Sequence, residues 1–133
     1  MTKILRALRS VAAVMVGYVT MVVLITLVQE TLFGGVSLQK SSPGVLVAAG
    51  AGTFLAAVVG GAVAGLIAPA RPQLHALAMC VMVVIETSYL VATGRVGGPL
   101  WFDLMAAGSL VVGIILGASL VALRRQRAKV MAR

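Results

Sequence analysis

Residues 45–68 read VLVAAGAGTFLAAVVGGAVAGLIA and contain no charged side chain. A helix of about 20 apolar residues crosses the roughly 30 Å of hydrocarbon in a bilayer, so this stretch predicts a transmembrane helix. Three further stretches have the same character, at 11–29, 73–92 and 100–123. Of the 133 residues, 61% are hydrophobic and 11% charged, with mean hydropathy +1.11, which exceeds what a water-soluble surface tolerates. We therefore expect an all-α integral membrane protein, a single domain over 1–133 that forms a bundle of four transmembrane helices.

Helix-breaking residues separate these spans. Glycine, serine and proline mark an irregular loop at 34–44, and glycine and proline end the third span at 94–99. Pro69 and Pro72 lie so close together that the second and third spans must form a tight hairpin. The first span follows a basic segment, but it is longer than the apolar core of a signal peptide and no small-residue cleavage site follows it. We therefore expect it to remain as a helix.

The basic residues predict the orientation of the bundle. Because Lys and Arg beside a span are retained in the cytoplasm during insertion, the side of the membrane with more of them is predicted to be cytoplasmic. Lys40 and Arg95 flank the spans on one side, whereas all other basic residues lie on the opposite side: Lys3, Arg6, Arg9, Arg71, Arg124, Arg125, Arg127, Lys129 and Arg133. Both termini and the hairpin at Arg71 are therefore expected in the cytoplasm.

A weak internal repeat recurs at an offset of 56 residues. Glu30-Thr31 corresponds to Glu86-Thr87, and Gly61-Ala62 corresponds to Gly117-Ala118. Such a repeat suggests two related helical hairpins, which would be parallel and related by an axis along the membrane normal. Chance matches in a chain rich in Ala, Gly and Val are the alternative explanation.

Small residues at every fourth position predict where the helices pack most closely. Lipid competes equally for apolar side chains, so helices in a bilayer associate through close backbone approach. Two stripes of this kind occur, Thr53, Ala57, Gly61 and Gly65 on the second span, and Ser109, Gly113 and Gly117 on the fourth. We expect these stripes to form the tightest helix contacts, either within one chain or as a dimer seam.

Glu86 is the first candidate for a functional residue. It lies seven residues before Thr93, about 10 Å into the span, and ionisable groups at such depth are costly and often functional. Helical spacing places it in a stripe that we expect to face inward, consisting of His75, Met79, Met82, Glu86, Tyr89 and Thr93, opposite Leu77, Val81, Val84 and Ser88.

This stripe has three interpretations. It could form a proton or cation path, with Glu86 near the outside and His75 at the cytoplasmic mouth. It could form a copper(I) site from His75, Met79, Cys80 and Met82, since soft ligands suit that ion. In the structural interpretation the methionines fill the core and His75 reaches the interface. Glu86 would then bond Thr87 or Tyr89, or pair with Arg95.

The other acidic residues lie at the ends of spans. Glu30 ends the first span and is a further candidate for the polar path, whereas Asp103 stands beside Trp101 in the first turn of the fourth. The indole ring at headgroup level and the carboxylate at a helix N-terminus are expected as interfacial anchors.

The sequence shows no catalytic or metal-binding motif. It contains no recognisable nucleophile with a base, no paired carboxylates and no metal-ligand set, so we expect a non-enzymatic protein with no cofactor and no metal. The basic tail is expected to touch anionic lipid, with no nucleic-acid role.

The segments Gly60-Gly61-Ala62-Val63-Ala64-Gly65-Leu66-Ile67-Ala68, Arg71-Pro72, His75-Ala76-Leu77-Ala78 and Pro99-Leu100-Trp101-Phe102 resemble uncharacterised small four-helix proteins of bacterial inner membranes. The resemblance covers roughly the last three spans. It implies a location in the bacterial inner membrane and a helix count, with no established activity. The small multidrug exporters place their essential glutamate within the first helix, whereas Glu30 stands at its end, and the polar filter residues of the small fluoride channels are missing.

Two classes of function follow as hypotheses. The first is an accessory or assembly subunit of a larger inner-membrane complex, because the chain has little soluble mass and several small-residue faces. The second is a small homo-oligomeric channel or transporter that uses Glu86 for protons or cations. The expected partners are the lipid bilayer and other membrane subunits or further copies of the chain.

Overall fold

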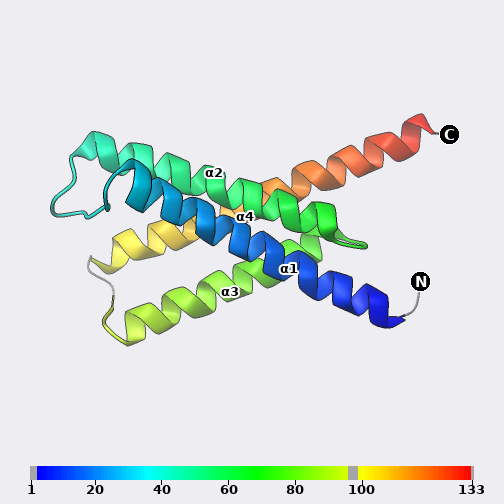
Figure 1. The fold of residues 1–133 in the computed structure, drawn as a ribbon, viewed down its shortest axis with the longest axis horizontal. Coiled ribbons are helices and arrows are strands. Elements are labelled where there is room, and N and C mark those ends of the chain that lie inside the picture. Colours follow the sequence, from blue (N-terminus) through cyan, green and yellow to red (C-terminus); the bar gives the residue numbers. More distant parts are fainter. Residues whose placement is uncertain (1–2, 96–98, 133) are drawn as a thin grey trace.

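The computed structural model describes residues 3–95 and 99–132, and these form an all-helical bundle without strands. Its elements are α1 (Lys3–Thr26), the π-helical turn η1 (Leu27–Leu32), α2 (Pro43–Ile67), α3 (Pro72–Ala92) and α4 (Leu100–Met131). Both termini and the short connection between α2 and α3 lie at one end of the bundle (Figure 1). The loop from η1 to α2, the end of α3 and the start of α4 lie at the other end.

Each of the four helices is long and apolar enough to cross a membrane, which indicates a multi-pass membrane protein. Helices α1 and α4 extend well beyond the apolar spans expected from the sequence. Helix α1 begins at Lys3, before the span at 11–29, and α4 has 32 residues and continues to Met131 instead of ending near residue 123. The basic residues from Lys3 to Arg9 and from Arg124 to Lys129 are therefore helical.

Local sequence explains where the helices begin and end. Ser42 caps α2, since its Oγ accepts a hydrogen bond from the Val45 N–H at 3.4 Å, and Pro43 occupies the first turn. Helix α2 ends at Ile67, before Pro69, and α3 starts again at Pro72, as the predicted tight hairpin requires. The turn after α3 passes through Gly94, whose φ of 64° suits a residue without Cβ.

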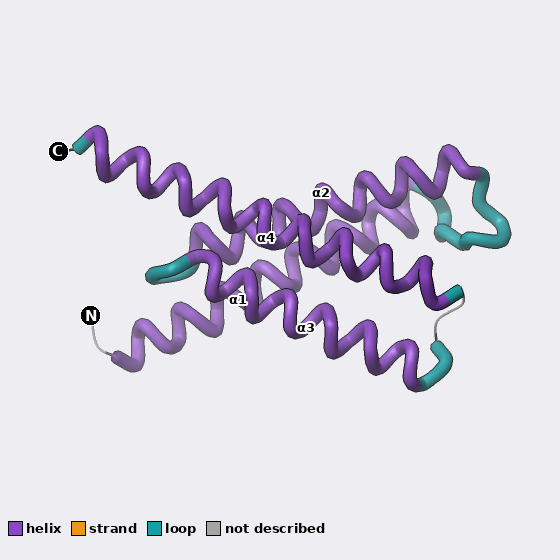
Figure 2. The backbone as a smooth tube through the Cα atoms, turned by 180° about the vertical axis from the view of Figure 1, so that it is seen from behind, coloured by secondary structure: helices purple, strands orange, loops and turns teal. Residues whose placement is uncertain are grey.

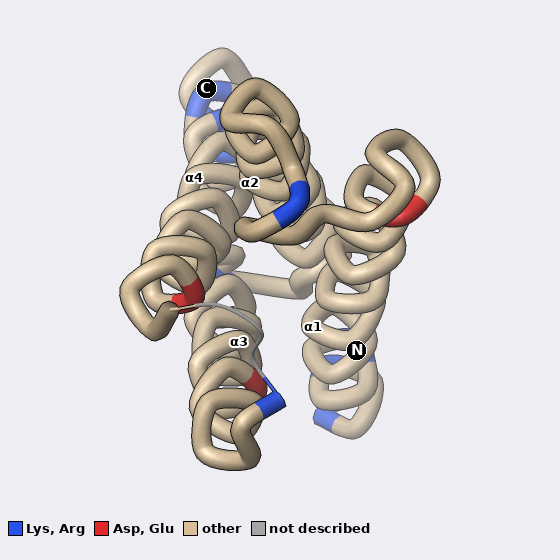
Figure 3. Tube along the Cα trace, turned by 90° about the vertical axis from the view of Figure 1, so that its left-hand side faces the viewer, with Lys and Arg blue, Asp and Glu red and all other residues tan. Residues whose placement is uncertain are grey.

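Helix α2 is central to the packing of the bundle. Its most extensive contact is with α4 and its next is with α1, whereas α3 packs mainly against α4. The long crossing helices and the loops that join them are visible from behind in Figure 2, and Figure 3 looks along the bundle with α2 beside α4. The interior is made mostly of Ala, Gly, Met, Val and Ile, and Thr53 is its buried polar side chain among the described residues.

The α2–α4 contact depends on glycines of the two predicted stripes. A Cβ on Gly61 would overlap the backbone carbonyl of Ile114, and a Cβ on Gly117 would overlap the backbone carbonyl of Val58. The repeat offset relates these two contacts to each other, because Gly61 and Gly117 are 56 residues apart and so are Val58 and Ile114. Gly113 opposes its own repeat mate Ala57, at 2.8 Å from an added Cβ to the Ala57 Cβ. The two helices therefore lie in register at the offset of the sequence repeat.

The polar ends of the stripes lie differently. Thr53 is buried, but its hydroxyl accepts a hydrogen bond from Gln29 of η1 at 3.3 Å. Ser109 is half-buried and donates to the Ala106 carbonyl of its own helix at 2.7 Å. Gly65 is buried and an added Cβ would lie 3.3 Å from the Val121 Cβ. The closest α2–α4 approach is thus centred on Gly61, Gly113 and Gly117.

A second close crossing, between α1 and α2, was missing from the sequence analysis. A Cβ on Gly17 would lie 2.8 Å from the Gly60 carbonyl oxygen and 2.6 Å from the Ala64 Cβ. A Cβ on Gly60 would lie 2.7 Å from the Met21 Cβ. Residues 13, 17 and 21 are the buried positions of α1. The spacing of Ala13 and Gly17, small residues four positions apart, is the signal that could have identified this contact.

Candidate functional site

Glu86 has a partner on another helix. The Tyr18 hydroxyl of α1 donates a hydrogen bond to the Glu86 Oε2 of α3. Glu86 stands six residues before Ala92, the last residue of α3, so it lies about 9 Å along the helix from that end. The partners considered from the sequence, Thr87, Tyr89 and Arg95, were therefore wrong for this bond. A tyrosine within an apolar span, with a hydroxyl to satisfy, is the signal that could have suggested Tyr18.

The expected inward orientation of the polar stripe on α3 is wrong for three of its members, Glu86, Tyr89 and Thr93, which are exposed. Glu86 is exposed at the surface of the bundle, and 56% of the Tyr89 surface is exposed. The face of α3 that packs inward instead consists of Pro72, Ala76, Met79, Cys80 and Val83. Small and compact side chains allow α3 to approach α4, so packing determines the buried face and the polar residues lie on its flank. The opposite positions Leu77, Val81, Val84 and Ser88 are exposed, as expected.

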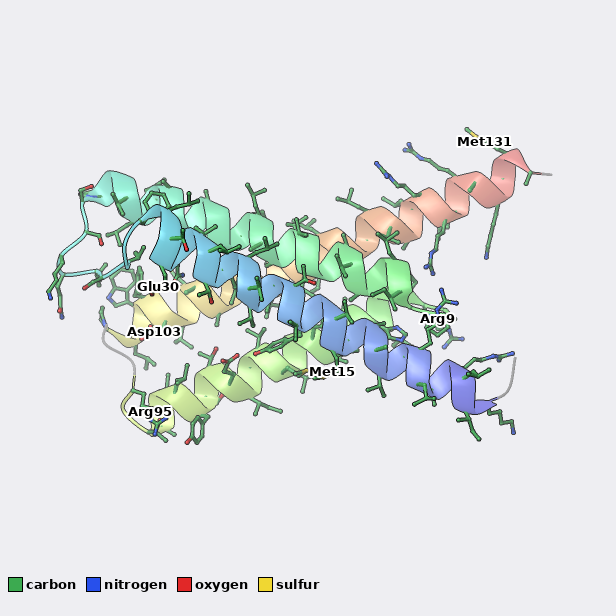
Figure 4. All side chains as sticks on the ribbon, viewed as in Figure 1. Arg9, Met15, Glu30, Arg95, Asp103 and Met131 are labelled. Carbon is green, nitrogen blue, oxygen red and sulfur yellow. The ribbon has the colours of Figure 1, made fainter. Side chains whose placement is uncertain are left out.

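His75 lies on the same flank of α3 as Glu86. Eleven residues separate them, which is about three helical turns, so both side chains project in nearly the same direction. His75 Nδ1 lies 3.3 Å from the Arg71 carbonyl oxygen. The imidazole lines a groove of about 390 Å³ between α1 and α3, whose wall includes Val14 and Met15. Figure 4 shows Met15 on the side of α1 that looks towards α3.

The structure does not bring together the residues considered for copper(I). Cys80 is buried and its Sγ lies 3.8 Å from the Val111 carbonyl of α4, whereas His75 faces α1. Met79 is fully buried in the core, whereas Met82 is half-buried. In the part of the chain that the structure describes, no three His, Cys, Asp or Glu side chains gather as a metal site would require.

The remaining acidic residues lie near the end opposite the termini. Figure 4 shows Glu30 and Asp103 there, together with Arg95. Glu30 is exposed on η1, on a different helix from Glu86. Asp103 is half-buried in the first turn of α4, next to an edge-to-face pair of Trp101 and the neighbouring Phe102, with ring centroids 5.9 Å apart. An exposed indole and a carboxylate at a helix N-terminus are compatible with the expected interfacial anchor.

The other end of the bundle holds a second set of polar contacts, which the sequence analysis did not foresee. The Arg9 Nε of α1 donates to the Ile67 carbonyl at 2.8 Å. Arg125 of α4 donates through Nη2 to the Leu66 carbonyl at 3.0 Å and through both Nη1 and Nη2 to the Ala68 carbonyl at 3.2 Å. These carbonyls are the unsatisfied acceptors at the C-terminus of α2, where the helix dipole also favours positive charge. Two arginines therefore fasten α1 and α4 to the end of α2.

Comparisons of the chain with known protein families, with curated proteins and with solved structures found no match. A proposal for the function therefore rests on the geometry of the chain itself. The resemblance to small four-helix inner-membrane proteins stays a prediction.

Proposed function

We propose that this chain is a non-enzymatic subunit that supports the assembly of a larger complex in the bacterial inner membrane. The observation that carries the proposal is the exposure of Glu86 within an apolar span, with Tyr18 as its hydrogen-bond donor. The bilayer, other membrane subunits and further copies of the chain are its proposed partners.

A carboxylate on the flank of a transmembrane helix needs more than one donor. An ionised carboxylate has about four acceptor positions, and the Tyr18 hydroxyl occupies one of them. Unsatisfied polar groups in hydrocarbon are costly, so intramembrane carboxylates usually face protein or a wet cavity. A helix of a partner placed over Glu86 and the exposed Tyr89 would supply the missing donors and exclude lipid.

The alternative is a small homo-oligomeric channel or transporter for protons or cations. The common flank of Glu86 and His75 favours it, because several copies could turn these flanks towards a shared path. A path within one copy is less well supported. The interior is mainly apolar among the described residues, and the groove between α1 and α3 is walled mostly by aliphatic side chains.

Photo-crosslinking in the native membrane tests both proposals. Benzoylphenylalanine would replace Tyr89 or Met82, which lie within one turn of Glu86, and in a control it would replace the exposed Leu55 of α2. We expect adducts of a defined protein mass from positions 82 and 89, which mass spectrometry would identify, and adducts with lipid from position 55.

Each outcome separates the candidates. An adduct with a different subunit supports the assembly role. An adduct with a second copy supports the homo-oligomer, and Glu86→Gln should then abolish cation flux in liposomes while the fold persists. Adducts with lipid alone from all three positions would overturn both.

The proposed orientation places both termini and the Arg71 turn in the cytoplasm. The basic residues support this orientation. Those that the structure describes at the end with both termini and Arg71 outnumber the two at the opposite end, Lys40 and Arg95. In a Cys80→Ala background, an impermeant maleimide should label intact cells through a cysteine at position 40 and not through one at position 132. The reverse labelling would contradict the orientation.

We also infer that the two hairpins are related by parallel duplication. The reciprocal contacts of Gly61 with Ile114 and Gly117 with Val58 support this relation, because they follow the offset of the sequence repeat. Swapping the 58–62 and 114–118 segments should then preserve assembly of the bundle, and loss of the folded monomer would refute the inference.

A further inference from the structure

Two open clefts flank Arg71 at the end of the bundle that holds both termini. One, of about 550 Å³, lies between the start of α1 and the turn into α3, and it is lined by Arg6, Arg71 and His75. The other, of about 900 Å³, lies between the same turn and the end of α4, and it is lined by Arg71, Arg125 and Lys129. Arg71 belongs to both clefts.

The charges in these clefts are not balanced by acidic side chains. None of the three acidic residues of the chain lines either cleft. The first turn of α3 begins between the clefts, at Pro72, so the positive end of its helix dipole adds to the field. Both clefts are therefore suited to an anion such as a phosphate.

Each cleft continues into an apolar groove that runs towards the middle of the bundle. The first shares Ser10, Leu74 and His75 with the groove between α1 and α3, which extends to Ala78. The second shares Gln73 and Leu74 with a groove of about 280 Å³ between α3 and α4, which extends to Ile115. A free phosphate or a nucleotide would leave these grooves unused, whereas acyl chains would fill them.

The backbone at Arg71 is held in an unusual conformation. Its φ of 45° is the one positive value at a non-glycine among residues 3–95 and 99–132. A left-handed conformation is unfavourable for a residue with a Cβ, which comes close to the following carbonyl oxygen. Glycine or asparagine would adopt it more easily, so an arginine at the boundary of the two clefts carries a cost in stability.

The geometry points to a binding site for one anionic phospholipid that carries two phosphates, a lipid of the cardiolipin class, which straddles the start of α3. One phosphate occupies the cleft of Arg6 and Arg71, and the other occupies the cleft of Arg71 and Lys129. The acyl chains lie in the grooves on the two sides of α3. This site is separate from Glu86 and does not depend on the function proposed above.

Native mass spectrometry of the full chain, with equimolar cardiolipin and phosphatidylglycerol in the micelle, tests the site. We expect one retained cardiolipin for each chain, in preference to phosphatidylglycerol. Arg71→Asn removes the shared charge but suits the left-handed backbone, and it should weaken cardiolipin binding about fivefold, the factor for about 1 kcal/mol per basic residue at an anionic surface. Arg124→Gln is the matched control, because Arg124 is exposed at the same end and lines neither cleft.

A second pair of variants tests the groove and does not alter the charge. Ala78→Phe should fill the groove between α1 and α3 and lower cardiolipin retention, whereas Ala106→Phe, at an exposed position that lines neither groove, should leave it unchanged. If Arg71→Asn fails to fold, the double variant Arg6→Gln with Lys129→Gln takes its place, with a loss of about 25-fold expected. Equal retention of the two lipids, or equal loss in Arg71→Asn and Arg124→Gln, would overturn the proposal.

Discussion

Replacing Gly113 with alanine would place a methyl group directly against α2. The added Cβ would lie 2.8 Å from the Ala57 Cβ and 3.0 Å from the Phe54 carbonyl oxygen. Carbon atoms in favourable contact are about 3.5–4.0 Å apart, so α2 and α4 must separate by roughly 0.7–1.2 Å. A gap of that size forfeits about a quarter to a half of the dispersion energy of the facing atoms. Because the nearest atoms are a Cβ and a backbone oxygen, no rotamer change relieves the overlap.

The same substitution at three glycines of α4 should give a graded result. Gly108→Ala meets nothing within 4 Å and gains helix propensity, so it should stabilise the protein by about 0.5–1 kcal/mol. Gly113→Ala should destabilise it by about 1–3 kcal/mol, the usual cost of overpacking. Gly117→Ala should cost about 3 kcal/mol or more, because its Cβ would overlap the Val58 carbonyl more deeply.

Reversible unfolding by SDS in mixed micelles, followed by circular dichroism, measures these free energies. The free energy of unfolding should decrease in the order Gly108→Ala, wild type, Gly113→Ala, Gly117→Ala. The reasoning fails if Gly117→Ala is as stable as Gly108→Ala, since the two variants share a helix and a chemistry and differ only in what the methyl meets.

Two further predictions concern the polar contacts. A double-mutant cycle of Tyr18→Phe and Glu86→Gln should give a coupling of about 0.6 kcal/mol in the same unfolding assay, the average for hydrogen bonds between helices in membranes, and at most about 1.7 kcal/mol. Additive effects of the two substitutions would refute the pairing. Arg125→Gln should cost about 1–3 kcal/mol by removing charge-assisted bonds from the end of α2. Arg124→Gln, at an exposed site with the same charge, should change stability by less than about 0.5 kcal/mol, and equal losses would show that net charge alone matters.

The sequence predicted the number, order and approximate position of the helices. Apolar stretches of sufficient length have few alternatives to a membrane helix, and prolines such as Pro69 and Pro72 stop a helix wherever it packs. It also indicated the glycines at the α2–α4 crossing, because Gly61 and Gly117 stand in stripes of small residues and close backbone approach requires such residues locally.

The sequence was less informative about which side of α3 is buried. Helical spacing placed Glu86 and Tyr89 in one stripe with Met79, but periodicity gives the relative directions of side chains and not the position of neighbouring helices. The small residues Ala76 and Cys80 allow α4 to approach, so α3 turns this face inward and Glu86 lies on its flank.

Residue identity and local spacing thus determine the elements and their breaks, because helix length, helix termination and the cost of charge in lipid are properties of short segments. The pairing of Tyr18 with Glu86 joins residues 68 positions apart, and the bonds from Arg125 to the end of α2 span 57 and 59 positions. Such contacts form only once the helices have packed against one another. Which helices become neighbours depends on the packing energy summed over the contact surfaces of all four helices, and no single stretch of the chain contains that information.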